Sequence, residues 1–156
     1  MSVPANAVGA TLTIRLVTRP APKLGPKPWH VTHHSSNPND ALRRYVRFTT
    51  DGTTTTLDST TFTSKWIAPC AGRLLQVYLR ATTNSGSTSV CLHLNDDTTV
   101  SSTREIMVNV LANTTASGSF LGKATSFVAG DRVSLSFQPT STLNNVVMTA
   151  VWELER

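Results

Sequence analysis

From about residue 45 onward, short stretches of alternating apolar and polar residues are separated by clusters of Gly, Asn, Asp, Ser and Thr. Within one stretch, Leu75, Val77 and Leu79 occupy every second position. A period of two is typical of strands with one buried face, and no window has the spacing of an amphipathic helix longer than a turn or two. The sequence therefore predicts an all-β, antiparallel β-sandwich, with strands at residues 45–50, 60–67, 73–81, 88–94, 105–111, 117–123, 132–137 and 146–154.

The first 47 residues differ in composition from the rest of the chain. They carry seven Lys and Arg residues against Asp40 alone, a net charge of +6, whereas residues 48–156 carry seven basic and eight acidic residues, a net charge of −1. Six of the eight prolines also lie before residue 47, where each removes a backbone donor and restricts its neighbour. We expect residues 1–47 to form an extended, basic, Pro-rich N-terminal arm and residues 48–156 to form the β-sandwich domain.

Length and composition exclude several classes of protein. A chain of 156 residues is long enough for one domain with its own core, and no apolar run approaches the ~18 residues of a membrane span. Cys70 and Cys91 are too few for a disulfide framework and are expected to be buried thiols. The N-terminus lacks the basic and apolar regions of a signal peptide, so we expect a protein that stays in the cytoplasm until it is assembled.

One pair of side chains could carry nucleophilic chemistry. Cys91 and His93 are two residues apart, and alternation places them with Ser89 on a face of the strand away from Val90 and Leu92, toward solvent. No third group that would orient the histidine is visible, and the motifs of serine hydrolases, P-loops and dinucleotide-binding proteins do not occur. The sequence therefore predicts a non-enzymatic protein.

Two further clusters could hold a metal ion. His30, His33 and His34 have a spacing that brings imidazoles together on a helix, but this segment has no helical pattern and no neighbouring Cys or carboxylate. Asp96 and Asp97 lie in a predicted turn between strands, where acidic residues are usually solvated turn formers. We expect neither a metal site nor a cofactor.

Three stretches resemble jelly-roll virion proteins of tailed bacteriophages: residues 64–80, 127–133 and 146–153. In the first, an A-P-x-x-G turn leads into a long strand. In the second, the Gly130-Asp131 turn leads into another strand, and the third is an apolar closing strand. The resemblance covers residues 60–154. It implies a jelly-roll domain that acts as a head decoration, or cement, protein: such proteins bind the outside of the capsid, join neighbouring major capsid protein subunits and are commonly homotrimers.

An N-terminal arm in such a protein would reach along the capsid surface. Apolar residues of the arm would contact the major capsid protein by strand addition or pocket filling, and arginines would pair with carboxylates. Trp29 is expected outside any strand, so that its ring covers either the sandwich or a partner. The predicted contact residues are Leu12, Ile14, Arg15, Leu16, Trp29, Arg43, Arg44 and Arg47.

Three other functions stay open. The same arm could bind nucleic acid in a self-assembling jelly-roll coat protein, although its charges are interspersed with Pro and apolar residues instead of forming a dense basic run. A phage tail or neck component could use the same domain. A carbohydrate-binding module would need exposed aromatic residues on a sheet, for which only Tyr78 and Trp152 are candidates.

Overall fold

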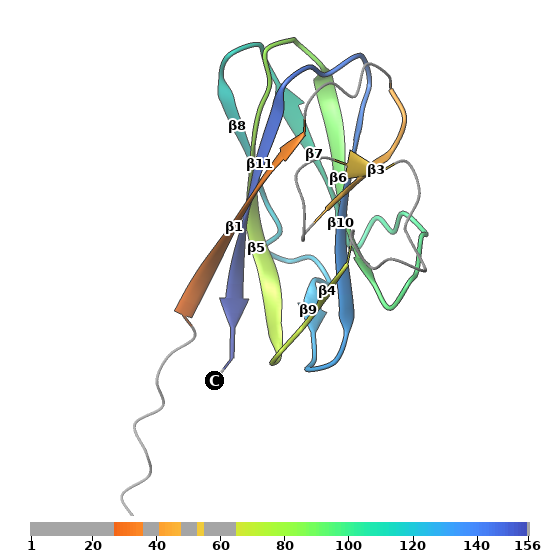
Figure 1. Ribbon diagram of the computed structural model, residues 1–156, viewed down its shortest axis with the longest axis vertical. Coiled ribbons are helices and arrows are strands. Elements are labelled where there is room, and N and C mark those ends of the chain that lie inside the picture. Colours follow the sequence, from red (N-terminus) through yellow and green to blue (C-terminus); the bar gives the residue numbers. More distant parts are fainter. Residues whose placement is uncertain (1–26, 36–40, 48–52, 55–64, 156) are drawn as a thin grey trace, which may run out of the picture.

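The computed structural model describes residues 27–35, 41–47, 53–54 and 65–155, and for 27–35 and 53–54 it describes the backbone only. These residues form strands and loops without a helix, so none of them lies in a helix that could cross a membrane (Figure 1). The strands are β1 (Lys27–Ser35), β2 (Arg44–Val46), β3 (Thr53–Thr54), β4 (Trp66–Ile67), β5 (Gly72–Arg80), β6 (Gly86–Leu94), β7 (Glu105–Val110), β8 (Thr115–Ser119), β9 (Ser126–Phe127), β10 (Arg132–Pro139) and β11 (Val146–Leu154).

The strands form two sheets that face each other. Sheet A has the order β1-β11-β5-β8, with β9 also paired with β5. Sheet B has the order β3-β2-β10-β6-β7, with β4 also paired with β10. Every pair is antiparallel. The predicted all-β, antiparallel β-sandwich is confirmed.

The eight strands of three or more residues pair in a nested order. The first pairs with the last (β1 with β11), the second with the second to last (β2 with β10), and the third with the third to last (β5 with β8). The middle two, β6 and β7, form a hairpin. Among these strands, every connection except the β6–β7 hairpin crosses from one sheet to the other, and this crossing brings distant parts of the chain side by side.

Most predicted strands agree with the structure to within two residues at each end. The agreement is best for β5, β6, β7, β10 and β11, where apolar residues alternate most regularly. Within the described residues β2 ends at Val46 and β4 begins at Trp66, while positions 48–50 and 60–64 of these two predicted strands lie outside the description. β8 ends at Ser119, because the chain turns at residues 121–124 and Gly122 has a φ of 80°.

The largest difference from the prediction is β1. Residues 27–35 were expected in the arm and Trp29 outside any strand, but β1 pairs with β11 over nine residues, from Lys27 opposite Leu154 to Ser35 opposite Val146. β1 is the edge of sheet A, where a proline such as Pro28 is tolerated because one side of the strand needs no ladder hydrogen bonds. Together with β2, this places two segments of the expected arm in the sheets.

The core lies between the inner faces of the two sheets. In β11 every second side chain from Val146 to Trp152 is buried, as the period-two pattern predicts. At one end of the sandwich the rings of Trp66, Phe127 and Trp152, from β4, β9 and β11, lie 5.6–5.9 Å apart between centroids. This aromatic cluster closes one end of the core: Trp152 is fully buried in it, as predicted, whereas Trp66 is half-buried and packs against it.

Gly118 in β8 provides a test of how closely the two sheets approach at their β7–β8 side. A Cβ atom on Gly118 would overlap Ile106 Cδ1 and lie 2.7 Å from Val108 Cγ2. We expect Gly118→Val to lower the free energy of unfolding by about 1–3 kcal/mol, measured by urea denaturation, because the packed core must shift. Ser117→Val is the control, since this exposed neighbour points away from the core. Equal stability of the two variants would contradict this packing.

Candidate functional site

The predicted contact residues divide into three groups. Leu12, Ile14, Arg15 and Leu16 lie outside the described residues. Trp29 lies in β1, where its backbone is opposite that of Trp152. The contact roles of all five stay predictions.

The three arginines of the segment around β2 are described with their side chains, and all are half-buried (Arg43, Arg44 and Arg47). Arg43 extends across the outer face of sheet B. Its Nη1 donates to Ser136 Oγ at 2.8 Å, and its Nη2 donates to Ser89 Oγ at 2.9 Å and to Gln138 Oε1 at 3.2 Å. The side chain is 15 % exposed. Its hydrogen bonds therefore hold β2 to β10 and β6 in the isolated chain.

His93 lies beside this arginine and is fully buried. Its Nδ1 is 2.9 Å from the Asp97 carbonyl oxygen, and its Nε2 is 2.7 Å from Ser136 Oγ. The ring centroid of Tyr45 is 5.3 Å from that of His93. Burial lowers the pKa of His93, and the charges of Arg43 and Arg104 add to this effect.

The prediction that His93 faces solvent is wrong. Residues 88–93 of β6 are buried on both faces of the strand, whereas alternation alone predicts burial of one face. Cys91 is buried on this second face as well, and burial raises the pKa of its thiol. Cys70 is half-buried, and both cysteines are free thiols.

This cluster contains the elements of a nucleophile and a base without access for a substrate. Ser136 Oγ is hydrogen-bonded to His93 Nε2, as in many hydrolases, but neither residue has exposed surface. Ser136 Oγ also accepts from Arg43, which opposes its activation. Among the described side chains, no group of three His, Cys, Asp or Glu residues is placed to hold a metal ion. The side chains of His30, His33 and His34 lie outside this description.

The acidic turn after β6 is more ordered than predicted. Asn95 and Asp96 have φ values of 53° and 67°, which confirms a tight turn. The carboxylates, however, are not simply solvated: Asp96 forms ion pairs with Lys65 and Arg132. Lys65 is almost fully buried, so this turn is fastened to the sandwich by a charge from the chain before β4.

Asp97 is fastened in the same way. The backbone N–H of Thr99 donates to one carboxylate oxygen at 2.9 Å, and Arg104 pairs with the other. The hydrogen bond from Thr99 and the guanidinium of Arg104 lower the pKa of Asp97 to about 2.

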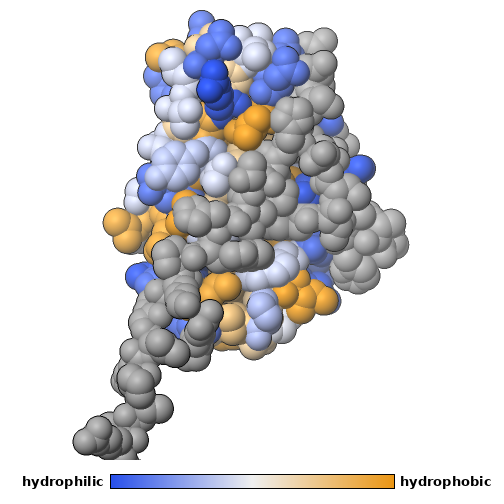
Figure 2. All heavy atoms as spheres, turned by 60° about the vertical axis from the view of Figure 1, so that its left-hand side comes forward, coloured by the Kyte–Doolittle hydropathy of each residue, from blue (hydrophilic) through white to orange (hydrophobic). Residues whose placement is uncertain are grey.

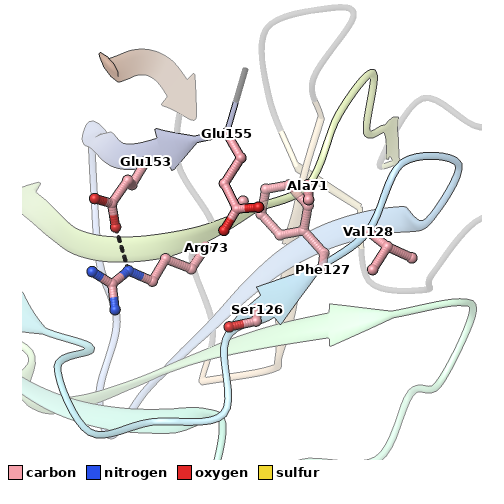
Figure 3. Close-up of a pocket in the computed structure, with 8 residues that line it drawn as sticks. Ala71, Arg73, Ser126, Phe127, Val128, Glu153 and Glu155 are labelled. Carbon is pink, nitrogen blue, oxygen red and sulfur yellow. Dashed lines mark hydrogen bonds and ion pairs between the residues drawn. The ribbon is translucent and has the colours of Figure 1, made fainter. Parts of the chain in front are cut away.

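A hollow of about 490 Å³ opens at the end of sheet A where β5, β9 and β11 meet (Figure 3). Arg73 pairs with Glu153 at one side, Glu155 lies above the ring of Phe127, and Val128 stands at the other side. Gly72 lies at the floor, where the chain packs too closely for a side chain: a Cβ there would overlap the carbonyl oxygen of Glu153 and lie 2.9 Å from the ring of Phe127.

The hollow is lined by two carboxylates, of which that of Glu153 is paired with Arg73, and by the apolar side chains of Ala71, Phe127 and Val128. β1 begins at the same end of the molecule, since its first residue is opposite Leu154. Figure 2 shows hydrophobic side chains in separate patches in the half of the molecule toward this end. Ile67 and Val128, both of this end, are 64 % and 61 % exposed. No sequence pattern predicts the hollow, because its walls come from three strands far apart in the chain.

The residues proposed for carbohydrate binding do not form a platform. Trp152 is fully buried in the aromatic cluster, which contradicts its proposed role, and Tyr78 is 37 % exposed on the outer face of β5. Among the described side chains, Tyr78 is the one exposed aromatic residue. A sugar ring stacking on this face would find one aromatic side chain.

Comparison with known proteins leaves the family open. No model of a known protein family matches this sequence, and no curated protein matches it.

Asp97 makes a testable contribution to acid stability. Its pKa of about 2 lies below the ordinary value of 3.8, so its charged form stabilises the fold above about pH 4 and this stabilisation is lost as pH falls toward 2. We expect Asp97→Asn to lower the thermal unfolding midpoint at pH 7 and to reduce its dependence on pH between 4 and 2. The exposed Glu155→Gln variant is the control for loss of one negative charge. Identical pH profiles for wild type and Asp97→Asn would contradict this role.

Proposed function

We propose that this protein is a non-enzymatic virion structural protein of a tailed bacteriophage. It binds the outside of the capsid and cements neighbouring subunits of the major capsid protein, as a homotrimer made in the host cytoplasm. The observation that carries the proposal is the joining of a basic, Pro-rich N-terminal segment to a closed two-sheet body through β1, which is paired with β11 over nine residues.

The strand order supports a jelly-roll body. Eight strands in two sheets pair first with last and inward to a central hairpin, and the chain crosses between the sheets at each other step. Double-sheet jelly rolls are built from eight strands in this manner and are common in viral structural proteins. The support comes from topology, since the comparisons identify no relative.

The distribution of charge supports binding through the N-terminal segment. Within the body, most described charged side chains pair with one another, as in the pairs Arg73–Glu153 and Arg104–Asp97. Residues 1–26 contain three basic residues and no acidic one: Arg15, Arg19 and Lys23. A partner surface rich in carboxylates would complement this segment.

Cementing requires several contacts to be held at once. The β1–β11 pairing places the start of β1 at the same end of the body as the exposed apolar residues Ile67 and Val128. The segment and this end of the body can therefore contact two subunits together, and a trimer would multiply such contacts. Linked weak contacts raise the overall affinity well above that of each one.

Deletion of residues 1–26 tests the role of the segment. We expect the truncated protein to keep its unfolding midpoint, because every described strand remains, and to lose at least tenfold in affinity for capsids prepared without this protein, measured by co-sedimentation. The full chain with Arg15, Arg19 and Lys23 all changed to Gln should show a part of this loss. Unchanged affinity of the deletion would overturn the proposed role. Deletion of residues 1–40 is unsuitable because it removes β1.

Light scattering on a sizing column tests the alternative of a coat protein. We expect a peak of trimer size with the ultraviolet spectrum of protein alone. The coat-protein alternative requires very large particles that absorb strongly at 260 nm and bind nucleic acid in a salt-dependent way. Arg43 is engaged in hydrogen bonds within the chain, which leaves fewer arginines for contact with either phosphates or a capsid protein.

A further inference from the structure

A continuous chain of polar contacts crosses the outer face of sheet B. It runs from His93 to Ser136, from Ser136 to Arg43, and from Arg43 to Ser89, whose Oγ donates to Glu105. These residues come from β6, β10, the segment before β2, and β7. The chain of contacts therefore links the segment before β2 to β10, β6 and β7, and Arg43 is its central member.

The hydrogen bonds determine the protonation state of His93. The Asp97 carbonyl oxygen can only accept, so Nδ1 carries the proton and donates to it at 2.9 Å. Nε2 is then the acceptor for the Ser136 hydroxyl, at 2.7 Å. The oxygen of that hydroxyl accepts from Arg43 Nη1 at 2.8 Å. Each of these groups is satisfied only while His93 is neutral.

The surroundings of His93 disfavour a second proton. The groups that face it are Arg43 before β2, Tyr45 of β2, Cys91 of β6, and Asp97 and Arg104 of the β6–β7 loop. Both arginines repel a positive imidazole, whereas Asp97 attracts it through its carbonyl oxygen and its carboxylate. That carboxylate is already paired with Arg104.

A proton on Nε2 breaks the chain at Ser136. The hydroxyl can no longer donate to the imidazole, and its hydrogen has no other described acceptor in this buried position. Two cations, the imidazolium and the guanidinium, would then bind the same oxygen atom. Arg43 is the partner that can leave, because its side chain is 15 % exposed whereas His93 is fully buried.

We propose that His93 is a pH-sensitive latch, whose protonation releases Arg43 and the short strand β2 from sheet B. β2 is held to β10 by two residue pairs, Tyr45 opposite Ser136 and Arg44 opposite Phe137, and by the burial of Tyr45 and Val46, so the Arg43 contacts are one part of its attachment. Release would free Arg43 for contact with a partner. The latch does not depend on the identity of that partner.

The latch predicts a defined pH dependence. His93 is neutral in the closed state and has an ordinary pKa of 6.5 once exposed, so opening takes up one proton below that pH. The equilibrium constant for opening should then rise by up to tenfold per pH unit between pH 6.5 and the lowered pKa of the closed state, and stay constant above pH 6.5. The closed state is thus stable at neutral pH and weakens in acid.

Amide hydrogen exchange of the full chain between about pH 8 and pH 5 tests the latch. After correction for intrinsic exchange rates, we expect opening of residues 44–46 to rise as the pH falls below 6.5, by up to tenfold per pH unit, while β5 and β11 keep their protection. His93→Gln, which cannot take up the proton, should abolish this rise. The variant with His30, His33 and His34 changed to Gln is the matched control and should keep it.

Three outcomes would overturn the latch: exchange of residues 44–46 that does not depend on pH, a parallel rise in β5 and β11, or a rise that persists in His93→Gln. Should His93→Gln fail to fold, ¹⁵N NMR of the imidazole in the wild-type chain replaces it. We expect the Nδ1–H form at pH 7 and protonation only below pH 6.5. A titration at or above 6.5 in the folded protein would contradict the proposal.

Discussion

The burial of β6 on both faces is the constraint on which the polar architecture depends. Its inner face packs in the core, and its outer face presents Ser89, Cys91 and His93 to a region without solvent. Buried polar groups must be hydrogen-bonded, because each unsatisfied one costs on the order of 1–3 kcal/mol. Arg43 meets this requirement from outside the sheet and thereby attaches β2 to it.

Ion pairs hold the end of the sandwich where β6 leads into the β6–β7 loop. Asp96 and Asp97 are held by Lys65, Arg132 and Arg104, which join the acidic turn to the chain before β4 and to β10. The charges of the body thus hold its own loops in place. In the proposed cement protein, the ends of the sandwich and the N-terminal segment would contact the capsid.

The sequence predicted elements best where one face of a strand is apolar and the turns contain Gly, Asn or Asp. β7 and β11 follow such patterns, so their buried residues could be read from alternation alone. In β5 the alternation holds for Val77 and Leu79, but Leu74 is buried in place of Leu75, beside an irregularity in the pairing with β11. β1 could not be predicted, because Pro28 and the prolines just before it argue against a strand, and only the free edge beside β11 makes Pro28 acceptable. Composition separated residues 1–47 from the rest, but pairing with distant strands decided which of them belong to the sheets.

For the candidate sites, the sequence by itself determined which chemical groups are available. These are a basic N-terminal segment, strands with one apolar face, and a Cys-His pair with no third group to orient the histidine. Only the tertiary structure decided that His93 is buried, that its partner is Ser136 and not Cys91, and that Arg43 reaches both strands. The residues that these contacts join are separated by between 43 and 93 positions in the chain. A local pattern reports which face of one strand is apolar, whereas the burial of its other face depends on which segments the fold lays over it.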